Sequence, residues 1–379
     1  MGVLSVCMKI AGWFPVVFIT AVVLWSYYAY VFELCIFTLA PLHSIVQLIF
    51  YILFYHCFLV MFVWSYWKTI FTQIGRMPTE FYLTSSELQR YEAEDRNEQQ
   101  LDVLKQISRE KRLPVHTRTF GGGMRYCGPC KAIKPDRAHH CSVCSTCVLK
   151  MDHHCPWVNN CVGFSNYKYF VLFLLYALLY CLYVAVTVLP YFIQFWTGGL
   201  GGENSKFHIL FLFFAAAMFA ISVSVLFCMH IHLTLTNRST LESFRPPVFR
   251  HGPDKDGFSR GSACNNFREI FGEEPKYWLL PMPTGKGDGV SYPVQARDED
   301  SDRLIDPGAE SDVLSGPEDE EDRHTKGAGK GEIRNSMKST VNYATMGQPE
   351  VPSVAINMEN STDGQVNYGA ETNSINSHR

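Results

Sequence analysis

This sequence has little excess of charge of either sign. Lys and Arg together number 33 against 36 Asp and Glu, the formal net charge is -3, and no basic stripe with interleaved aromatic residues occurs. Because nucleic-acid-binding surfaces concentrate Lys and Arg, we expect no nucleic-acid partner. The first apolar run also lacks the short apolar region and cleavage site of a signal peptide, so we expect it to be retained as a membrane span.

Ionisable groups are scarce inside the long apolar runs, where only isolated candidates such as His56 occur. A metal transporter would need paired ionisable groups there, and buried helices of a soluble protein would need polar faces that these runs lack. A helix crosses a core about 30 Å thick with roughly 20 apolar residues. Four runs qualify, so we predict an all-α polytopic membrane protein with four transmembrane helices: Ala11–Cys35, Ser44–Trp67, Tyr169–Trp196 and Phe207–Leu233.

The distribution of Lys and Arg predicts the orientation of these helices. The connectors 36–43 and 197–206 carry only Lys206, whereas the segment from Lys68 to Lys168 is dense in both residues. Positive residues stay on the cytosolic side, which places both termini and this segment in the cytosol. Thiols remain reduced there. The compartment that we expect is the Golgi, the plasma membrane or both.

Composition divides the chain into six segments. They are the first two spans (1–75), a polar helix and linker (76–123), a cysteine-rich domain (124–168), the last two spans (169–235), membrane-facing C-terminal motifs (236–284) and a disordered acidic and polar tail (285–379). Thr84 and Glu87 have the spacing of a capping box, so we predict that the polar helix covers 85–112.

The cysteine-rich domain contains an internal repeat with a period of 14 residues. Each copy has the pattern Cys-x2-Cys-x9-His-x6-Cys, which supplies the four ligands of a closed tetrahedral zinc site. In a reducing compartment such a pattern favours metal over disulfides. We therefore predict two structural zinc ions. Their ligands are Cys127, Cys130, His140 and Cys147 in the first copy and Cys141, Cys144, His154 and Cys161 in the second.

One cysteine of this domain is left over. Cys155 stands 14 residues after Cys141, where a third copy would begin, but Val158 occupies the position of its second cysteine. Asp152 and His153 directly precede the zinc ligand His154, whereas the first copy has Ala138 at the position of Asp152.

This difference suggests a catalytic group. We interpret Cys155 as a nucleophile, His153 as its base and Asp152 as the residue that orients the base. The alternative is that Asp152 and His153 only orient zinc ligands, which leaves Cys155 unexplained. Cys155 precedes the third apolar run by a short segment, so the reaction would take place near the membrane and suits transfer of a long acyl group.

The run from Cys141 to Cys161, with Asp152-His153-His154-Cys155 at its centre, resembles the signature of the DHHC palmitoyltransferases. The resemblance extends roughly over residues 10–290. It implies four helices over a cytosolic domain with two zinc ions that take no part in the chemistry. It also implies a two-step reaction in which Cys155 takes palmitate from palmitoyl-CoA and passes it to a protein cysteine.

The resemblance assigns supporting residues as well. Ser239-Thr240-Leu241-Glu242 is similar to a Thr-Thr-x-Glu motif of the family, with Ser in place of the first Thr. It implies that Thr240 lies near Asp152, that Glu242 completes the motif, and that Asn266 braces the domain against the helices.

The implied partners are acyl-CoA, the lipid membrane, and cytosolic or membrane proteins with cysteines near the bilayer. Lys134, Arg137 and Lys150 are candidate contacts for CoA phosphates, and solvated surface charge is the alternative. A membrane-anchored zinc adaptor without acyl chemistry is the competing class. It would have no surplus reactive thiol.

A bound acyl chain would run from Cys155 into the bilayer, lined first by Trp157 and Phe170. At 1.5 Å per residue, Tyr180 lies about 16 Å and Ser26 about 22 Å into their spans. Tyr180 is thus close to the midplane of a core about 30 Å thick, and Ser26 comes to a comparable or slightly greater depth. Both positions match residues that close the acyl cavity in the family. Simple packing between helices is the alternative for this pair.

Overall fold

The computed structural model describes residues 10–42, 45–197, 203–249 and 257–294. Within them, four helices are long and apolar enough to cross a membrane, as predicted. The first begins as α2 (Phe14–Tyr27) and continues as the π-helix η1 (Tyr28–Leu39). The others are α3 (Ile45–Phe71), α6 (Tyr167–Thr197) and α7 (Glu203–Thr236).

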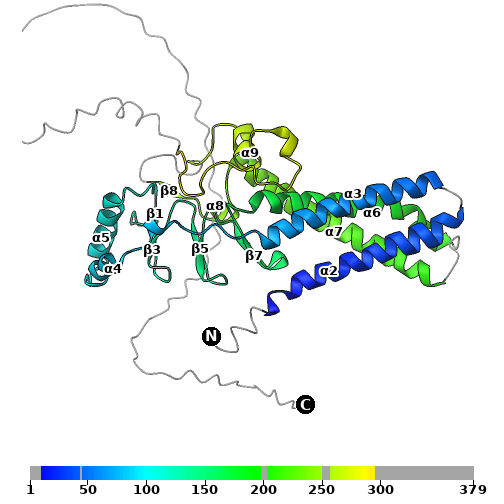
Figure 1. The fold of residues 1–379 in the computed structure, drawn as a ribbon, viewed down its shortest axis with the longest axis horizontal. Coiled ribbons are helices and arrows are strands. Elements are labelled where there is room, and N and C mark those ends of the chain that lie inside the picture. Colours follow the sequence, from blue (N-terminus) through cyan, green and yellow to red (C-terminus); the bar gives the residue numbers. More distant parts are fainter. Residues whose placement is uncertain (1–9, 43–44, 198–202, 250–256, 295–379) are drawn as a thin grey trace, which may run out of the picture. The chain divides into compact units, whose positions relative to one another are not determined.

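These helices form an elongated bundle in which α6 is the most buried, because it packs against both α3 and α7 (Figure 1). Large apolar side chains such as Phe14, Val46 and Ile221 are exposed on the outside of the bundle. An apolar outer surface of this extent would be unfavourable in water and suits contact with lipid.

The cysteine-rich domain adds short strands to the helical fold. In the described residues, these strands pair antiparallel into a small ladder and three hairpins. The ladder joins β1 (Thr117–Arg118) to β8 (Val248–Phe249), and the hairpins are β2 (Tyr126–Cys127) with β3 (Ala132–Ile133), β4 (His139–Cys141) with β5 (Thr146–Val148), and β6 (His153–Cys155) with β7 (Asn160–Val162). The sequence repeat is thus a structural repeat, with His140 opposite Cys147 and His154 opposite Cys161.

The predicted polar helix over 85–112 is two helices, α4 (Ser85–Glu92) and α5 (Asn97–Glu110). The capping box of Thr84 and Glu87 is present at the start of α4. The chain leaves the helical conformation after Ala93, and Arg96 is extended where α5 begins. The prediction of one continuous helix was wrong. The interruption is only a few polar residues long, and such a short break does not change the pattern of apolar residues.

The C-terminal motifs form α8 (Thr240–Phe244) and α9 (Ala263–Phe271), and α9 packs against α7 and α6. The predicted start of the disordered tail, residue 285, is too early. Residues 285–294 are described, and both Val290 and Tyr292 are buried. The Tyr292 ring lies against the Arg137 guanidinium, 5.1 Å away. Residues 295–379 lie outside the described residues.

Candidate active site

Each of the two Cys/His sets predicted from the repeat is a compact cluster. The ligand atoms of each set lie within 4.8 Å of one another. His140 Nδ1 is 3.5, 3.3 and 4.0 Å from the sulfurs of Cys127, Cys130 and Cys147. His154 Nδ1 is 3.7, 3.6 and 3.5 Å from those of Cys141, Cys144 and Cys161.

These distances fit a tetrahedral metal ion. Bond lengths of about 2.3 Å to sulfur and 2.0–2.1 Å to nitrogen put the two ligand atoms ~3.6 Å apart at the tetrahedral angle. The two clusters share the β4–β5 hairpin, which contributes His140 and Cys147 to the first and Cys141 to the second. Metal at both clusters would therefore stabilise consecutive hairpins together.

Cys155 belongs to neither cluster. It ends β6, is buried, and is followed by the single turn η4 (Pro156–Val158). Asn159 continues that turn with a left-handed backbone, and the Asn160 side chain donates to three carbonyl groups at the C-terminal end of α3. Asn160 thus attaches the hairpin that carries Cys155 to the membrane bundle.

His153 and Asp152 lie next to Cys155 as a hydrogen-bonded pair. His153 Nδ1 donates to Asp152 Oδ2 over 2.6 Å. An ionised carboxylate only accepts hydrogen bonds, so Nδ1 carries the proton and Nε2 is free to accept one. Thr240 donates to the same carboxylate twice, from its backbone N–H to Oδ1 over 2.8 Å and from its hydroxyl to Oδ2 over 2.7 Å.

Asp152 and His153 also shift each other's pKa. Burial would lower the pKa of His153, but the hydrogen bonds and charges of Asp152 and Cys155 outweigh it and raise the pKa to about 9. Burial would raise the pKa of Asp152, but the hydrogen bond and charge of His153, with the Thr240 backbone, hold it below its usual range. His153 is therefore a stronger base, which favours transfer of a second proton to its Nε2, while Asp152 stays a carboxylate.

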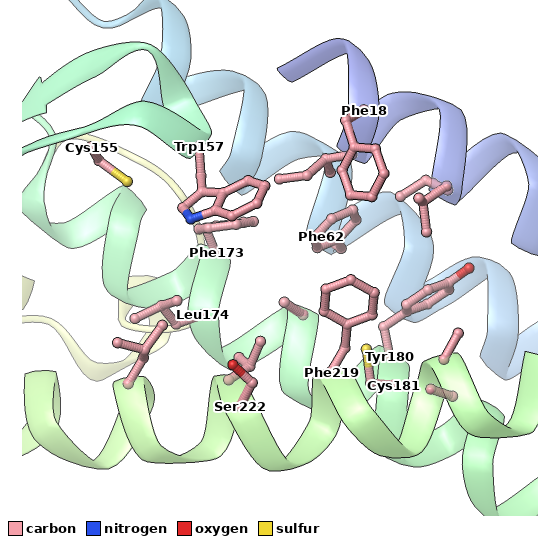
Figure 2. A pocket seen from close by; sticks show the side chains of 18 of the residues that line it. Phe18, Phe62, Cys155, Trp157, Phe173, Leu174, Tyr180, Cys181, Phe219 and Ser222 are labelled. Atoms are coloured by element: carbon pink, nitrogen blue, oxygen red, sulfur yellow. The ribbon is translucent and has the colours of Figure 1, made fainter. Parts of the chain in front are cut away.

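An apolar cavity of about 490 Å³ begins beside this group and runs between the helices. Ligand pockets typically have about 300–1,000 Å³. Cys155, His153, Trp157 and Phe170 line one part of it, and Ser26 and Tyr180 line another. Figure 2 shows Cys155 and Tyr180 at opposite ends of the cavity, with aromatic rings between them. The hydroxyl groups of Ser26 and Tyr180 are 2.6 Å apart.

The chain matches a family model described as DHHC palmitoyltransferase over residues 122–246. It is 56% identical over 289 residues to palmitoyltransferase ZDHHC20 of Homo sapiens, covering 76% of this chain and 78% of that protein. It is 51% identical over 317 residues to palmitoyltransferase ZDHHC2 of Mus musculus, covering 84% of this chain and 85% of that one. The chain belongs to the DHHC palmitoyltransferase family. The predicted family and protein S-palmitoyltransferase activity are thereby confirmed, and the chain is a multi-pass membrane protein.

In this DHHC palmitoyltransferase, Ser239, which replaces the first Thr of the family motif, has a structural role. Ser239 caps α8 in a reciprocal capping box with Glu242, so its hydroxyl accepts from the Glu242 N–H. The pattern Ser-x-x-Glu is the sequence signal that indicates such a box. The cap fixes the start of α8, and with it the two hydrogen bonds from Thr240 to Asp152.

Two of the three candidate CoA contacts have buried carboxylate partners. Arg137 is fully buried and donates from Nε and Nη2 to the two oxygens of Glu242, each over 2.7 Å. Lys150 Nζ donates to Glu269 over 3.1 Å. Burial and the Arg137 charge lower the pKa of Lys150 to about 8, although Glu269 opposes this. Among the described residues, Lys134 has no carboxylate partner within ion-pair distance.

Asn266 lies where a brace between α9 and α7 would be. Its side-chain amide donates to the carbonyl of Leu235, near the end of α7, over 2.8 Å. Its side-chain oxygen accepts from the Arg260 N–H over 2.6 Å. One buried side chain therefore ties the C-terminal segment to the last membrane helix.

His230 and Tyr55 are two residues near the site that no sequence pattern indicated. His230 of α7 lies beside the Asp152–His153 pair, with its ring 5.8 Å from that of His153 and its Nδ1 3.1 Å from the Tyr167 hydroxyl. The hydroxyl of Tyr55, on α3, lies 2.7 Å from the Tyr180 hydroxyl. Both residues sit in helices that are apolar on every face, so no periodicity indicated which side faces inward.

Proposed function

We propose that this chain transfers palmitate, and similar long acyl chains, from acyl-CoA to cysteine thiols of proteins at the membrane, with Cys155 as the covalent intermediate. One observation carries the proposal. Cys155 is outside both metal-ligand sets, yet it is buried beside the Asp152–His153 pair at one end of the apolar cavity. A purely structural cysteine needs neither neighbour, whereas a nucleophile that holds a fatty acyl chain needs both.

In the first step, His153 Nε2 takes the thiol proton of Cys155 while Asp152 holds the Nδ1 proton. The thiolate attacks the carbonyl carbon of the acyl-CoA thioester and forms a new carbon–sulfur bond. The bond to the CoA sulfur then breaks, and CoA leaves as a thiol with the proton that His153 returns. The products are free CoA and acyl-Cys155.

In the second step, the thiol of a substrate protein replaces CoA. His153 takes its proton, the substrate sulfur attacks the thioester carbonyl of acyl-Cys155, and the bond to Cys155 breaks. The Cys155 sulfur recovers a proton from His153, which restores the enzyme. Because Cys155 is near the start of α6, we expect substrates whose cysteines lie close to the bilayer.

Zinc at the two Cys/His clusters supplies structure in this proposal. Three sulfurs and one nitrogen complete a tetrahedral set in each cluster, which leaves no position for water or substrate, as in closed structural sites. The residues that would hold the ions are the eight of the repeat. Their work is to keep β6 and Cys155 in place.

The donor enters from the cytosolic side, where the excess of Lys and Arg predicts that the active site and both termini lie. Lys134 is our candidate contact for CoA phosphates. For Arg137 and Lys150, the buried pairs with Glu242 and Glu269 favour a bracing role over direct contact with CoA. The compartment, Golgi or plasma membrane, stays a prediction.

The test uses the purified full chain with labelled palmitoyl-CoA. The wild type should acquire a hydroxylamine-sensitive label that maps to Cys155, and Cys155→Ser should lose both the label and transfer to a substrate peptide while keeping two zinc ions. Cys264→Ser is a matched control because Cys264 is a free, exposed thiol on α9. Loss of zinc from Cys155→Ser, or a label that stays in it, would overturn the assignment.

A further inference from the structure

Next to the end of the cavity where Tyr180 lies is a third hydroxyl, which belongs to a residue outside the cavity lining. Tyr55 of α3 is fully buried, and its hydroxyl lies 2.7 Å from that of Tyr180. Ser26 and Tyr180 are among the residues that line the cavity, whereas Tyr55 lies behind them. Tyr180 therefore connects Tyr55 to the cavity.

The hydroxyl groups at this end can be ordered into one chain of donors. Ser26 Oγ donates to the carbonyl of Val23 over 2.9 Å. Each hydroxyl has a single proton, so Ser26 must accept from Tyr180 over their 2.6 Å contact. Tyr180 has then used its proton, so it must accept from Tyr55. The order is Tyr55 to Tyr180 to Ser26 to the backbone of α2, and it links three helices.

The ring of Tyr55 is itself fixed. It stacks on Tyr30 with centroids 4.3 Å apart and planes 9° from parallel. The Tyr30 hydroxyl in turn donates to Thr187 Oγ1 on α6 over 2.9 Å. Tyr55 can therefore present its hydroxyl to Tyr180 without ordering a flexible side chain each time, and hydrogen-bonded chains of this kind polarise one another in a low-dielectric interior.

We propose that Tyr55 is a positioning residue that holds the Tyr180 ring across the end of the cavity, and so sets the upper limit of acyl chain length together with Ser26. The inference rests on the proposed acyl function of the cavity. Without the Tyr55 hydroxyl, one of the two hydrogen bonds on Tyr180 is lost, and the ring can turn aside for a chain that extends further.

The conservative variant Tyr55→Phe tests this, because it keeps the ring that stacks on Tyr30 and removes only the hydroxyl. Hydrogen bonds between membrane helices average about 0.6 kcal/mol, which corresponds to roughly a threefold effect. The measured quantity is the ratio of eighteen-carbon to sixteen-carbon acyl-CoA used when the two compete. We expect this ratio to rise about threefold. The melting temperature is measured alongside, since a residue that only supports the bundle would change it without changing the ratio.

Tyr183→Phe is the matched control. Tyr183 also lies on α6, and its hydroxyl donates to the carbonyls of Phe50 and Tyr51 on α3, away from Tyr180. It should leave the ratio unchanged. In a Tyr180→Phe background, which has already lost the hydroxyl that both neighbours bind, Tyr55→Phe should add nothing further.

An unchanged ratio in an active Tyr55→Phe enzyme overturns the inference, as does an equal rise in Tyr183→Phe. Failure of the proposed function gives a different result. In that case the wild type itself forms no acyl-Cys155 or does not discriminate between the two donors.

Discussion

Thr240 binds both oxygens of the Asp152 carboxylate, with its backbone N–H on one and its hydroxyl on the other. The two residues are 88 positions apart in the chain, and they join α8 to the strand that carries Cys155. Oδ2 also accepts from His153. The plane of the carboxylate is therefore set by three donors, and the His153 ring follows it.

Removal of the Thr240 hydroxyl should slow acylation of Cys155. Thr240→Val keeps the shape and the backbone donor but leaves Oδ2 with His153 alone. A hydrogen bond to a charged group contributes about 1.5–3 kcal/mol, so we expect a loss of roughly 10- to 100-fold in the single-turnover rate of acyl-Cys155 formation.

Thr240→Ser restores the hydroxyl and is the control for this prediction. It should recover most of the rate, since both donors to Asp152 are present again. Equal rates in the wild type and Thr240→Val would show that the hydroxyl does not matter for the orientation of Asp152. Zinc content should stay at two ions in both variants.

Substitution of the neighbouring residues His153 and His154 should distinguish a catalytic role from a metal-binding role. His154→Ala removes a ligand from the second cluster, so it should lower zinc content and destabilise the domain, because structural zinc contributes directly to folding. His153→Ala should keep both ions and lose the rate of thioester attack. Metal analysis and thermal melting of both variants check this, and equal loss of metal in the two would contradict the division of roles.

The local parts of the site could be predicted from the sequence. The ligands of both clusters follow from a 14-residue spacing, because a metal ion held by hairpins takes its ligands from nearby positions. The surplus of Cys155 followed from the same count. The spans followed from length and apolar character, which the bilayer dictates irrespective of packing.

Long-range partners could not be predicted from spacing. The contact of Thr240 with Asp152 came from family resemblance alone, and nothing in the pattern pairs Arg137 with Glu242 across 105 positions. In α3, a run apolar on all faces hid the inward direction of Tyr55. The buried Glu33 of the first span accepts from the Tyr28 hydroxyl. An ionisable residue inside a span is a signal that the sequence does carry, but its spacing does not indicate the partner.

The buried Arg137–Glu242 pair should make a large contribution to the stability of the cytosolic domain. Arg137 is 2% exposed and Glu242 is 6% exposed, so removal of one partner leaves the other charged and buried. Such changes typically cost about 3–5 kcal/mol. We expect Arg137→Met to lower the melting temperature strongly.

The double variant Arg137→Met with Glu242→Leu provides the comparison. Apolar replacement of both partners is often neutral or stabilising, so it should recover part of the loss. Glu242 also closes the capping box of α8, so recovery of stability should exceed recovery of activity. A double variant no more stable than Arg137→Met alone would argue against an isolated buried charge as the cause.

Substitutions of Ser26 and Tyr180 should shift the preferred acyl chain length in opposite directions. Ser26 and Tyr180 are buried and line the cavity, and their hydroxyl groups are 2.6 Å apart. Tyr180 lies at the opposite end of the cavity from Cys155 (Figure 2). Ser26→Phe adds a ring where a small side chain stands, so it should shift preference toward shorter acyl-CoAs. Tyr180→Ala removes the ring and should shift it toward longer ones, with the sixteen-carbon donor no longer preferred. Competition among acyl-CoAs of graded length, with label on Cys155 as the readout, measures both shifts. The two substitutions change volume with opposite sign, so a general loss of stability cannot produce opposite shifts. If both variants keep the wild-type profile, the pair only packs between helices, and another part of the cavity limits the chain.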